Sequence, residues 1–439
     1  MELVNIKLSN VIKNQAILNI GCTGHVANGK STIVKSFTGV TTQKFKSEKE
    51  RNITINIGYS GCKIWYSKEN NQIKYSHSKN NSILDKNGNN MTLIHHFSFV
   101  DCPGHEAYMN NMITGSAVMD MAFLVEDANM ENLNVQSKEH LIALMHSEVS
   151  NVLIIQNKCD LINSDRIIYN KNCLLKQLSK YICNDRLHII PCIAQQSVNL
   201  EYIIKYLINN LSNYDKNLND KFKLSIIRTF DTNKQNEDIV NLRGGVLGGT
   251  IITGVLNKND YIQISPGIIE KKDNIWKINP IITKVNTIVC EGNNLEYAIP
   301  GGLIGIGTDI DPYLCKMNKL IGQIVTFPGD QPDISDQITI KYKQFKKNKS
   351  NDIIKVDSVI YLSVLGHICD GKIIKIDNNL ITICLSKPIC LCENNISVLS
   401  NYNNRKSVLG FGKIMDYIKL ENIFIPSKLV NINPKKNTY

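Results

Sequence analysis

The chain has 439 residues, more than a single hydrophobic core usually serves, so about two to four domains are expected. A composition of 43% hydrophobic and 20% charged residues excludes an intrinsically disordered chain, and no apolar run reaches the roughly 18 residues of a membrane span. The formal net charge of +11 is compatible with an acidic partner such as nucleic acid. Thirteen cysteines without a C-x-x-C pair, and an N-terminus without a secretory segment, predict a reduced, cytoplasmic protein.

Short apolar runs alternate with helical segments along the first half of the chain. Segments such as "STIVKSF" and "SKEHLIALMH" carry good helix formers at helical spacing. This alternation predicts an α/β domain, a mostly parallel sheet with helices on both faces. The predicted strands are "AILNI" (16–20), "FSFV" (97–100), "AFLV" (122–125), "VLII" (152–155) and "HII" (188–190). The polar residues 67–92, rich in Asn, Ser and Lys, are predicted to be a mobile insertion.

From about Lys221 the pattern changes to short β-rich segments such as "KLSIIRTF", "GGVLGGTIITGVL", "DYIQI" and "LITICLS". Turn signals such as "NKND" and "SPG" separate them, which predicts antiparallel β-barrels. The stretch "FPGDQPD" (327–333) carries two prolines and is the expected boundary between two barrels. The predicted domains are therefore residues 1–217, 218–328 and 329–439.

Residues 24–31, "GHVANGKS", fit the pattern G-x-x-x-x-G-K-[ST] between a predicted strand and a predicted helix. The glycines allow backbone N–H groups to turn inward around phosphate oxygens, Lys30 adds a positive charge, and Ser31 places a hydroxyl on Mg²⁺. The alternative is a glycine turn before a helix with an incidental lysine. The predicted phosphate-binding residues are Gly24, Ala27, Asn28, Gly29, Lys30, Ser31 and Thr32.

The stretch "NKCD" (157–160) follows the apolar run "VLIIQ" and predicts the base that is bound. Asp160 can accept two hydrogen bonds from guanine, from N1–H and from the exocyclic amine, which adenine does not offer in that arrangement. Asn157 can bridge to the base edge and the loop, and the stem of Lys158 can cover a ring face. By itself N-K-x-D is a common polar turn. When it follows a phosphate-binding loop in the same chain, it indicates that the bound base is guanine.

Two further segments complete the predicted site. In "DCPGH" (101–105), Asp101 would reach Mg²⁺ through water, the N–H of Gly104 would meet the γ-phosphate, and His105 would orient the attacking water. In "ERNITI" (50–55), the hydroxyl of Thr54 would complete the Mg²⁺ coordination. The predicted catalytic residues are His105, Lys30 and Thr54; the predicted Mg²⁺ ligands are Ser31, Thr54 and, through water, Asp101.

In this order the four motifs resemble the translational GTPases related to elongation factor Tu. "KFKSEKERNITINIGY", "SFVDCPGHEAYMNNMITGSAVMDMAFL" and "IPGGLIGIGTDIDPYLCKMNKLIGQIV" resemble more closely the gamma subunit of eukaryotic and archaeal translation initiation factor 2. The resemblance implies GTP, GDP and Mg²⁺ as ligands and a GTP-binding domain followed by two barrels. It also implies a heterotrimer with alpha and beta subunits, GTP-dependent delivery of initiator methionyl-tRNA to the small ribosomal subunit, and slow hydrolysis without an activating factor. A nucleotide-exchange factor is a further expected partner.

The sequence departs from that family at several points. Relatives carry paired cysteines that form a zinc knuckle; here Cys62 remains, with His77, His95 and His96 as other possible ligands, so no zinc is predicted. The guanine-capping phrase is "IAQ" (193–195): Ile193 replaces a serine, while the N–H of Ala194 is still expected to reach the guanine oxygen, beside Gln195. Asn28 stands where a histidine is usual, and "VQSKEH" (135–140) replaces "PQTSEH", which predicts an altered surface contact.

Two alternatives to an initiation GTPase stay open from the sequence. An elongation-type carrier of aminoacyl-tRNA would share the chemistry and differ in the RNA that it delivers. A scaffold that binds tRNA without hydrolysing GTP would keep the fold and lose the turnover. The basic stretches "YKQFKKNKSND" (342–352) and "NINPKKNTY" (431–439) are either RNA-facing segments or solvated loops.

Overall fold

The structure is a computed structural model that describes residues 8–43, 48, 54–147, 149, 151–210, 218–234, 238–273, 275–316, 319–344, 354–364, 367–391, 395–402 and 405–421. The chain divides into two compact units, Met1–Asp215 with Glu291–Asn293, and Lys216–Cys290 with Asn294–Tyr439. Most of the basic stretch 342–352, all of 431–439 and residues 50–53 of "ERNITI" lie outside the described residues.

The first unit is built on a seven-stranded sheet with the order β3-β2-β4-β1-β5-β6-β7. Strands β4, β1, β5, β6 and β7 pair in parallel, whereas β2 is antiparallel to both β3 and β4. Every residue of β1 is buried, as expected for a central strand covered on both faces. The strands are β1 (Leu18–Thr23), β2 (Gly58–Ser67), β3 (Gln72–His77), β4 (Thr92–Asp101), β5 (Met121–Asp127), β6 (Asn151–Asn157) and β7 (His188–Pro191).

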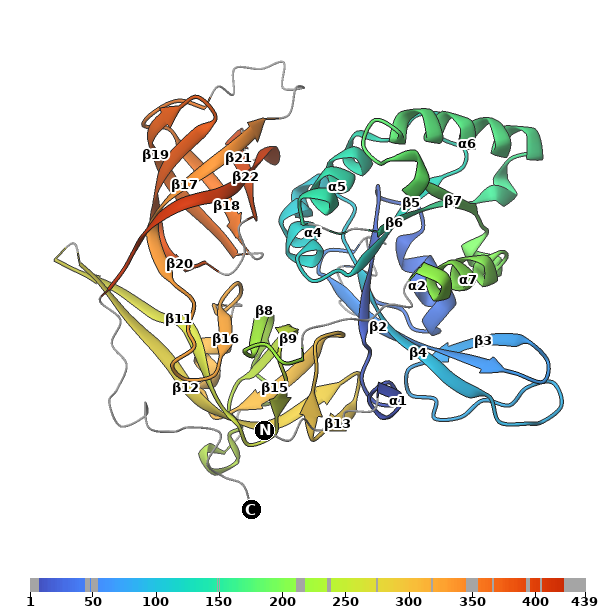
Figure 1. Cartoon of the computed structure of the whole chain (residues 1–439), viewed down its shortest axis with the longest axis horizontal. Coiled ribbons are helices and arrows are strands. Elements are labelled where there is room, and N and C mark those ends of the chain that lie inside the picture. The colour runs from blue at the N-terminus through green and yellow to red at the C-terminus, as the bar shows by residue number, and fades with distance from the viewer. Residues whose placement is uncertain are drawn as a thin grey trace. The chain divides into compact units, whose positions relative to one another are not determined.

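Helices cover both faces of this sheet: Figure 1 shows α2 and α7 on one side of its strands and α4 and α5 on the other. Ile33, Val34 and Phe37 of α2 are buried at helical spacing, so one face of α2 packs on the sheet. The α-helices are α1 (Leu8–Val11), α2 (Lys30–Thr38), α4 (Met109–Ser116), α5 (Val135–His146), α6 (Ser164–Leu178) and α7 (Leu200–Asn210). Single 3-10 turns are η1 (Glu106–Tyr108), η2 (Cys159–Leu161), η3 (Asn184–Arg186) and η4 (Ala194–Gln196).

Residues 67–92 are more ordered than the sequence predicted. The expectation of a mobile insertion is wrong for β3, which pairs along its whole length with β2. Asp85 also ties the segment together, because its carboxylate accepts hydrogen bonds from Ser67 Oγ and Asn70 Nδ2, both at 2.9 Å. The polar composition concealed this network, because its hydrogen bonds join polar side chains within the segment itself.

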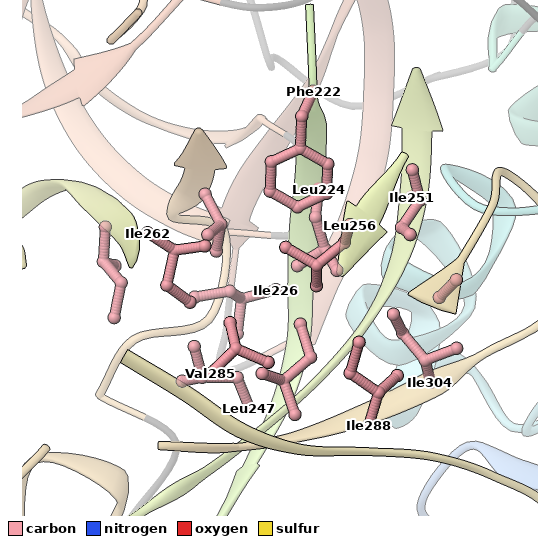
Figure 2. Packing of buried hydrophobic residues seen from close by; sticks show 14 of the residues in the cluster. Phe222, Leu224, Ile226, Leu247, Ile251, Leu256, Ile262, Val285, Ile288 and Ile304 are labelled. Atoms are coloured by element: carbon pink, nitrogen blue, oxygen red, sulfur yellow. The ribbon is translucent and has the colours of Figure 1, made fainter. Parts of the chain in front are cut away.

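The second unit begins with an antiparallel sheet that curls into a barrel. This seven-stranded sheet has the order β11-β16-β8-β9-β15-β12-β13, and β11 also pairs with β12. Phe222, Leu224, Leu247 and Ile262 lie in the apolar core of this sheet (Figure 2). The elements are β8 (Lys223–Phe230), η5 (Ile239–Asn241), β9 (Val246–Thr253), β10 (Leu256–Asn257), β11 (Tyr261–Lys272), β12 (Ile275–Cys290), β13 (Asn293–Leu295), β14 (Tyr297–Ala298), β15 (Ile304–Thr308), α8 (Pro312–Cys315) and β16 (Ile324–Thr326).

The remaining strands form a closed barrel in the order β17-β20-β19-β18-β21-β22. Residues 327–333, "FPGDQPD", connect it to β16. The predicted architecture, an α/β domain followed by two antiparallel barrels, is therefore confirmed. The strands are β17 (Ile334–Gln344), β18 (Val359–Val364), β19 (His367–Asp377), β20 (Leu380–Cys390), β21 (Asn395–Tyr402) and β22 (Arg405–Lys419).

None of the helices in the described part of the chain combines the length and the apolar character that crossing a membrane requires.

Candidate functional site

The loop between β1 and α2 has the backbone of a phosphate-binding loop. Gly24, Ala27 and Gly29 have φ values of +129°, +66° and +96°, a region that L side chains rarely adopt. A Cβ atom at Gly24 would lie 2.4 Å from the carbonyl oxygen of Val125, so a glycine is needed there for space as well as for conformation. Helix α2 begins at Lys30, directly after the left-handed Gly29. The N-terminus of α2 therefore adds its positive dipole to the turn.

Helix α5 contacts this loop through Gln136 and His140, which lie in the stretch 135–140 where only an altered surface contact was predicted. The N–H of Gly24 donates to Nδ1 of His140 at 3.0 Å, and the side chains of His25 and Gln136 are hydrogen-bonded. Burial lowers the pKa of His140 to about 3, so its imidazole is neutral and Nδ1 is an acceptor. Gln136 and His140 lie four residues apart on one helix face. That spacing in "VQSKEH" was the available signal; Val135, which replaces a proline, is exposed.

Asn28 is also held in place by the fold. It is buried, and its Nδ2 donates to the carbonyl oxygen of Val125 at 2.8 Å. Its side chain is therefore engaged with β5. This anchoring explains how an asparagine can stand at a position where a histidine is usual.

Lys30 places a buried cation at the centre of the loop. Its Nζ donates to the carbonyl oxygen of His25 at 2.8 Å, and burial lowers its pKa. Gly104 lies against the same group: a Cβ atom there would sit 2.4 Å from Nζ of Lys30 and 2.8 Å from the backbone nitrogen of Val26. The absence of a side chain at Gly104 is thus what lets the 101–105 segment approach the loop so closely.

The three predicted Mg²⁺ ligands converge on one point. The hydroxyl of Ser31 donates to Oδ2 of Asp101 at 2.6 Å, and it lies 3.0 Å from Oγ1 of Thr54. Thr54 is buried, and its hydroxyl is 3.5 Å from Oδ2 of Asp101. Oδ1 of Asp101 is buried and has no hydrogen-bond partner among the residues that the structure describes. Two hydroxyls and a carboxylate with an unsatisfied oxygen are the donor chemistry that Mg²⁺ takes, so these residues fit the ion.

The predicted guanine-binding segments meet at Asn157. Its Nδ2 donates to the carbonyl oxygen of Asn28 at 2.9 Å, and its Oδ1 accepts from the N–H of Ala194 at 3.1 Å. It therefore joins the phosphate-binding loop to the 193–195 loop. The Oγ of Ser36 in α2 also donates to the carbonyl oxygen of Ala194 at 2.5 Å. These bonds support the loop in which Ile193 replaces the serine of relatives.

The side chains expected to contact the base are those of Lys158, Asp160 and Gln195, which follow strands β6 and β7. The backbone of Lys158 is in the left-handed conformation, with a φ value of +63°. Its Nζ forms an ion pair with Oδ2 of Asp127 at 2.8 Å. Asp160, in η2, and Gln195, in η4, are exposed. Both 3-10 turns follow the carboxyl ends of parallel strands, β6 and β7, where open α/β sheets bind ligands.

A cavity of about 180 Å³ joins three of the predicted segments. His105 lines it and is exposed, and its Nδ1 accepts from the N–H of Ala107 at 3.1 Å, which caps η1. Gln43 also lines the cavity, although the sequence analysis did not name it. The lining residues are Val26, Ala27, Gly29, Lys30, Ser31, Thr32, Gln43, Thr54, Gly104 and His105.

The four residues considered as zinc ligands lie on the β2-β3-β4 part of the sheet. Cys62 is buried, and burial raises the pKa of its thiol far above the ordinary range. His77 Nδ1 accepts from the N–H of Lys79, and His95 stacks on Phe97 with ring centroids 5.4 Å apart. Within the described ranges no cluster of three or more His, Cys, Asp or Glu side chains is arranged to hold a metal ion. The expectation of no zinc stays a prediction.

Glu126 of β5 is a buried carboxyl beside the loop that no sequence pattern indicated. It is 3% exposed, and its Oε1 has no hydrogen-bond partner among the described residues. Burial raises its pKa from 4.5 to about 7, although the positive charge of Lys30 opposes the rise. Because the folded state holds this proton more tightly than the unfolded chain, stability falls as the pH rises from 4.5 towards 7.

Replacing Glu126 with glutamine should therefore stabilise the protein at pH 8. A pKa shift from 4.5 to about 7 corresponds to about 3 kcal/mol of unfolding free energy, fully lost above pH 7. Urea unfolding of both proteins at pH 5 and pH 8 measures this, with Glu201→Gln on the exposed face of α7 as the control. If the difference in unfolding free energy between Glu126→Gln and wild type were the same at pH 5 and pH 8, the prediction would be wrong.

Comparisons with known proteins agree with this geometry. The family model described as "Elongation factor Tu GTP binding domain" matches residues 15–213, and "Elongation factor Tu domain 2" matches residues 244–326. The eukaryotic translation initiation factor 2 subunit gamma of Encephalitozoon cuniculi (strain GB-M1) is 35% identical over 420 residues, covering 92% of this chain and 94% of that protein. The Schizosaccharomyces pombe subunit gamma is 34% identical over 426 residues, covering 92% and 95%.

Solved structures share the fold at lower identity. The bacterial selenocysteine-specific elongation factor EF-Sec has a TM-score of 0.70 at 19% identity, over 92% of this chain and 59% of that chain. Elongation factor SelB from Methanococcus maripaludis, solved with the GTP analogue GPPNHP, has a TM-score of 0.67 at 19% identity, over 93% and 82%. Sequence identity is higher to the initiation factor subunit, 35% over 92% of this chain, than to these elongation factors, and it therefore shows the family. The chain therefore belongs to the family of translation initiation factor 2 gamma subunits, elongation factor Tu-like GTPases that act in translation initiation.

Proposed function

We propose that the cavity at the start of α2 binds Mg²⁺·GTP and that this chain is a GTP-dependent switch. The convergence of Ser31, Thr54 and Asp101 beside the buried Lys30 carries the proposal. Ser31 and Thr54 would hold the ion directly and Asp101 through water. When bound, Mg²⁺ supplies charge neutralisation on the phosphate oxygens. Gly24 would shape the turn, since its own N–H donates to His140. The phosphates would be held by the loop residues Ala27, Asn28, Gly29, Lys30, Ser31 and Thr32.

The guanine base would be held at the ends of β6 and β7. Asp160 would accept from the two N–H donors of guanine, and the N–H of Ala194 would reach the guanine oxygen, next to Gln195. Lys158 would cover one face of the ring with its alkyl stem. Asn157 would act by holding the loops together, because both ends of its amide are already bonded to them.

Hydrolysis would depend on residues that surround the γ-phosphate. Lys30 would stabilise the negative charge that develops there, and His105 would orient the attacking water. The N–H of Gly104 and the backbone of Thr54 would contact the γ-phosphate itself. Loss of that phosphate would release both segments, which gives the switch its two states.

The biological role that we propose is that of the family. The two relatives reported above are named as the gamma subunit of translation initiation factor 2. By this relationship the chain would assemble with alpha and beta subunits and carry initiator methionyl-tRNA to the small ribosomal subunit. It would act in the cytoplasm with an activating factor and an exchange factor, and without zinc. Its net charge of +11 suits an RNA partner. The domain boundaries at 217/218 and 328/329 belong to the same proposal.

Capture of methionylated initiator tRNA by the purified chain tests this role. With a nonhydrolysable GTP analogue, binding should be about 5- to 150-fold tighter than with GDP, the range of typical couplings between two sites. The measurement is made with and without the alpha subunit, and with elongator tRNA as the control. Equal capture in the two nucleotide states would reject the switch. Preference for elongator tRNA would favour an elongation-type carrier.

A further inference from the structure

Thr42 is a second buried threonine at the metal-binding end of the cavity. Helix α2 ends at Thr38 and is capped by Gly39, so Thr42 lies four residues beyond the helix. Thr42 is 4% exposed, and its hydroxyl donates to Oδ2 of Asp101 at 2.6 Å. This bond is as short as the one from Ser31 to the same oxygen. Oδ2 of Asp101 thus accepts short hydrogen bonds from two hydroxyls, those of Thr42 and Ser31.

The neighbouring strand is shaped to leave room for this contact. Gly58, the first residue of β2, is paired directly with Asp101 in β4. A Cβ atom at Gly58 would lie 2.6 Å from Cβ of Thr42. The bare backbone of Gly58 therefore provides the space in which Thr42 lies against the end of β4.

We infer that Thr42 is a positioning residue of the Mg²⁺ site, which acts by holding the carboxylate of Asp101. The inference rests on the proposed function, because it assumes that Asp101 serves the ion. Thr42 holds Oδ2, while Oδ1 has no partner among the described residues. When the hydroxyls of Ser31 and Thr54 bind the metal, they would no longer donate to Asp101. The hydrogen bond from Thr42 would then still fix the orientation of the carboxylate. Groups that orient metal ligands in this way commonly set metal affinity.

The same contact joins the ion to the segment that follows α2. Thr42 is adjacent to Gln43, which lines the cavity. Any equilibrium that moves residues 40–43 away from β4 would thus also release Asp101. Linkage makes this coupling reciprocal. The free energy by which the contact of Thr42 strengthens Mg²⁺ binding should equal the free energy by which bound Mg²⁺ stabilises residues 40–43 against β4.

A magnesium titration of nucleotide release tests the inference. The full chain is loaded with a fluorescent GDP, and its dissociation rate is measured as a function of Mg²⁺ concentration. In Thr42→Val the Mg²⁺ concentration at the midpoint should rise about 10- to 100-fold, the usual cost of losing an outer-shell hydrogen-bond partner at a metal site. The dissociation rate in EDTA should equal that of wild type, because no metal is then held. Thr42→Ser, which keeps the hydroxyl, should restore most of the midpoint.

The neighbouring Thr41 is the matched control, because it is exposed and the change Thr41→Val is chemically identical. Gly58→Ala should shift the midpoint in the same direction as Thr42→Val. If Thr42→Val does not fold, as judged by thermal unfolding without ligands, Thr42→Ala measures the same loss. A midpoint in Thr42→Val or Thr42→Ala equal to that of wild type would overturn the inference alone. Absence of Mg²⁺-dependent GDP binding in wild type would overturn the proposed function and, with it, the inference.

Discussion

In Asp160→Asn, the affinity for GDP should fall by about 100- to 10,000-fold, while the affinity for xanthosine diphosphate rises. The aspartate would accept two charge-assisted hydrogen bonds from guanine, each worth about 1.5–3 kcal/mol. An asparagine offers one acceptor and one donor in their place, so guanine is left with an unpaired N–H. Xanthine carries an oxygen where guanine carries its amine, and the amide of the variant can donate to that oxygen.

The position of Asp160 makes this test specific. It is exposed in η2, whereas Asn157, three residues earlier, is buried and carries the bonds between the loops. The substitution should therefore leave the fold intact. Asp165→Asn is the matched control, since Asp165 is exposed in α6 and loses the same charge. Competition binding with GDP and xanthosine diphosphate gives both affinities. Unchanged GDP affinity in Asp160→Asn would refute the assignment of the base-binding residue.

The second large effect is expected in His105→Ala. It should slow factor-stimulated GTP hydrolysis by about 100- to 10,000-fold, because the attacking water loses the group that orients it; positioned catalytic side chains commonly have effects of this size. GTP affinity should stay close to that of wild type, because the phosphates are held by the loop at 24–31 and by Lys30. The assay is single-turnover hydrolysis with small ribosomal subunits and the activating factor. A scaffold without turnover would show no phosphate release even in wild type.

A structural role of His105 must be separated from a catalytic one. Its Nδ1 accepts from the N–H of Ala107, so the alanine variant also removes the cap of η1. His105→Asn keeps a side-chain acceptor at this position, since asparagine is a good capping residue, but lacks the imidazole. If His105 orients water, His105→Asn should be nearly as slow as His105→Ala. A rate close to wild type in His105→Asn would mean that His105 serves only as the cap.

The sequence alone predicted the architecture, and it named most of the residues that line the cavity at the start of α2. The segments 24–31, 101–105 and 157–160 are contiguous, and each follows an apolar strand. Contiguous patterns of this kind encode their own local backbone, as the left-handed Gly24 and Gly29 show. Parallel strands then bring such loops to one edge of the sheet. That is why the site could be assembled from the order of the motifs.

The tertiary structure decided which residues hold those motifs in place. Gly24 and His140 are 116 residues apart, Asn28 and Asn157 are 129 apart, and Thr42 and Asp101 are 59 apart. The burial of Glu126, and with it a raised pKa, depends in the same way on what packs around β5. Periodicity and spacing show which face of an element is buried, and they do not show which element covers it. Hydrogen bonds between buried groups far apart in the chain exist only once folding has chosen those neighbours and removed the water between them.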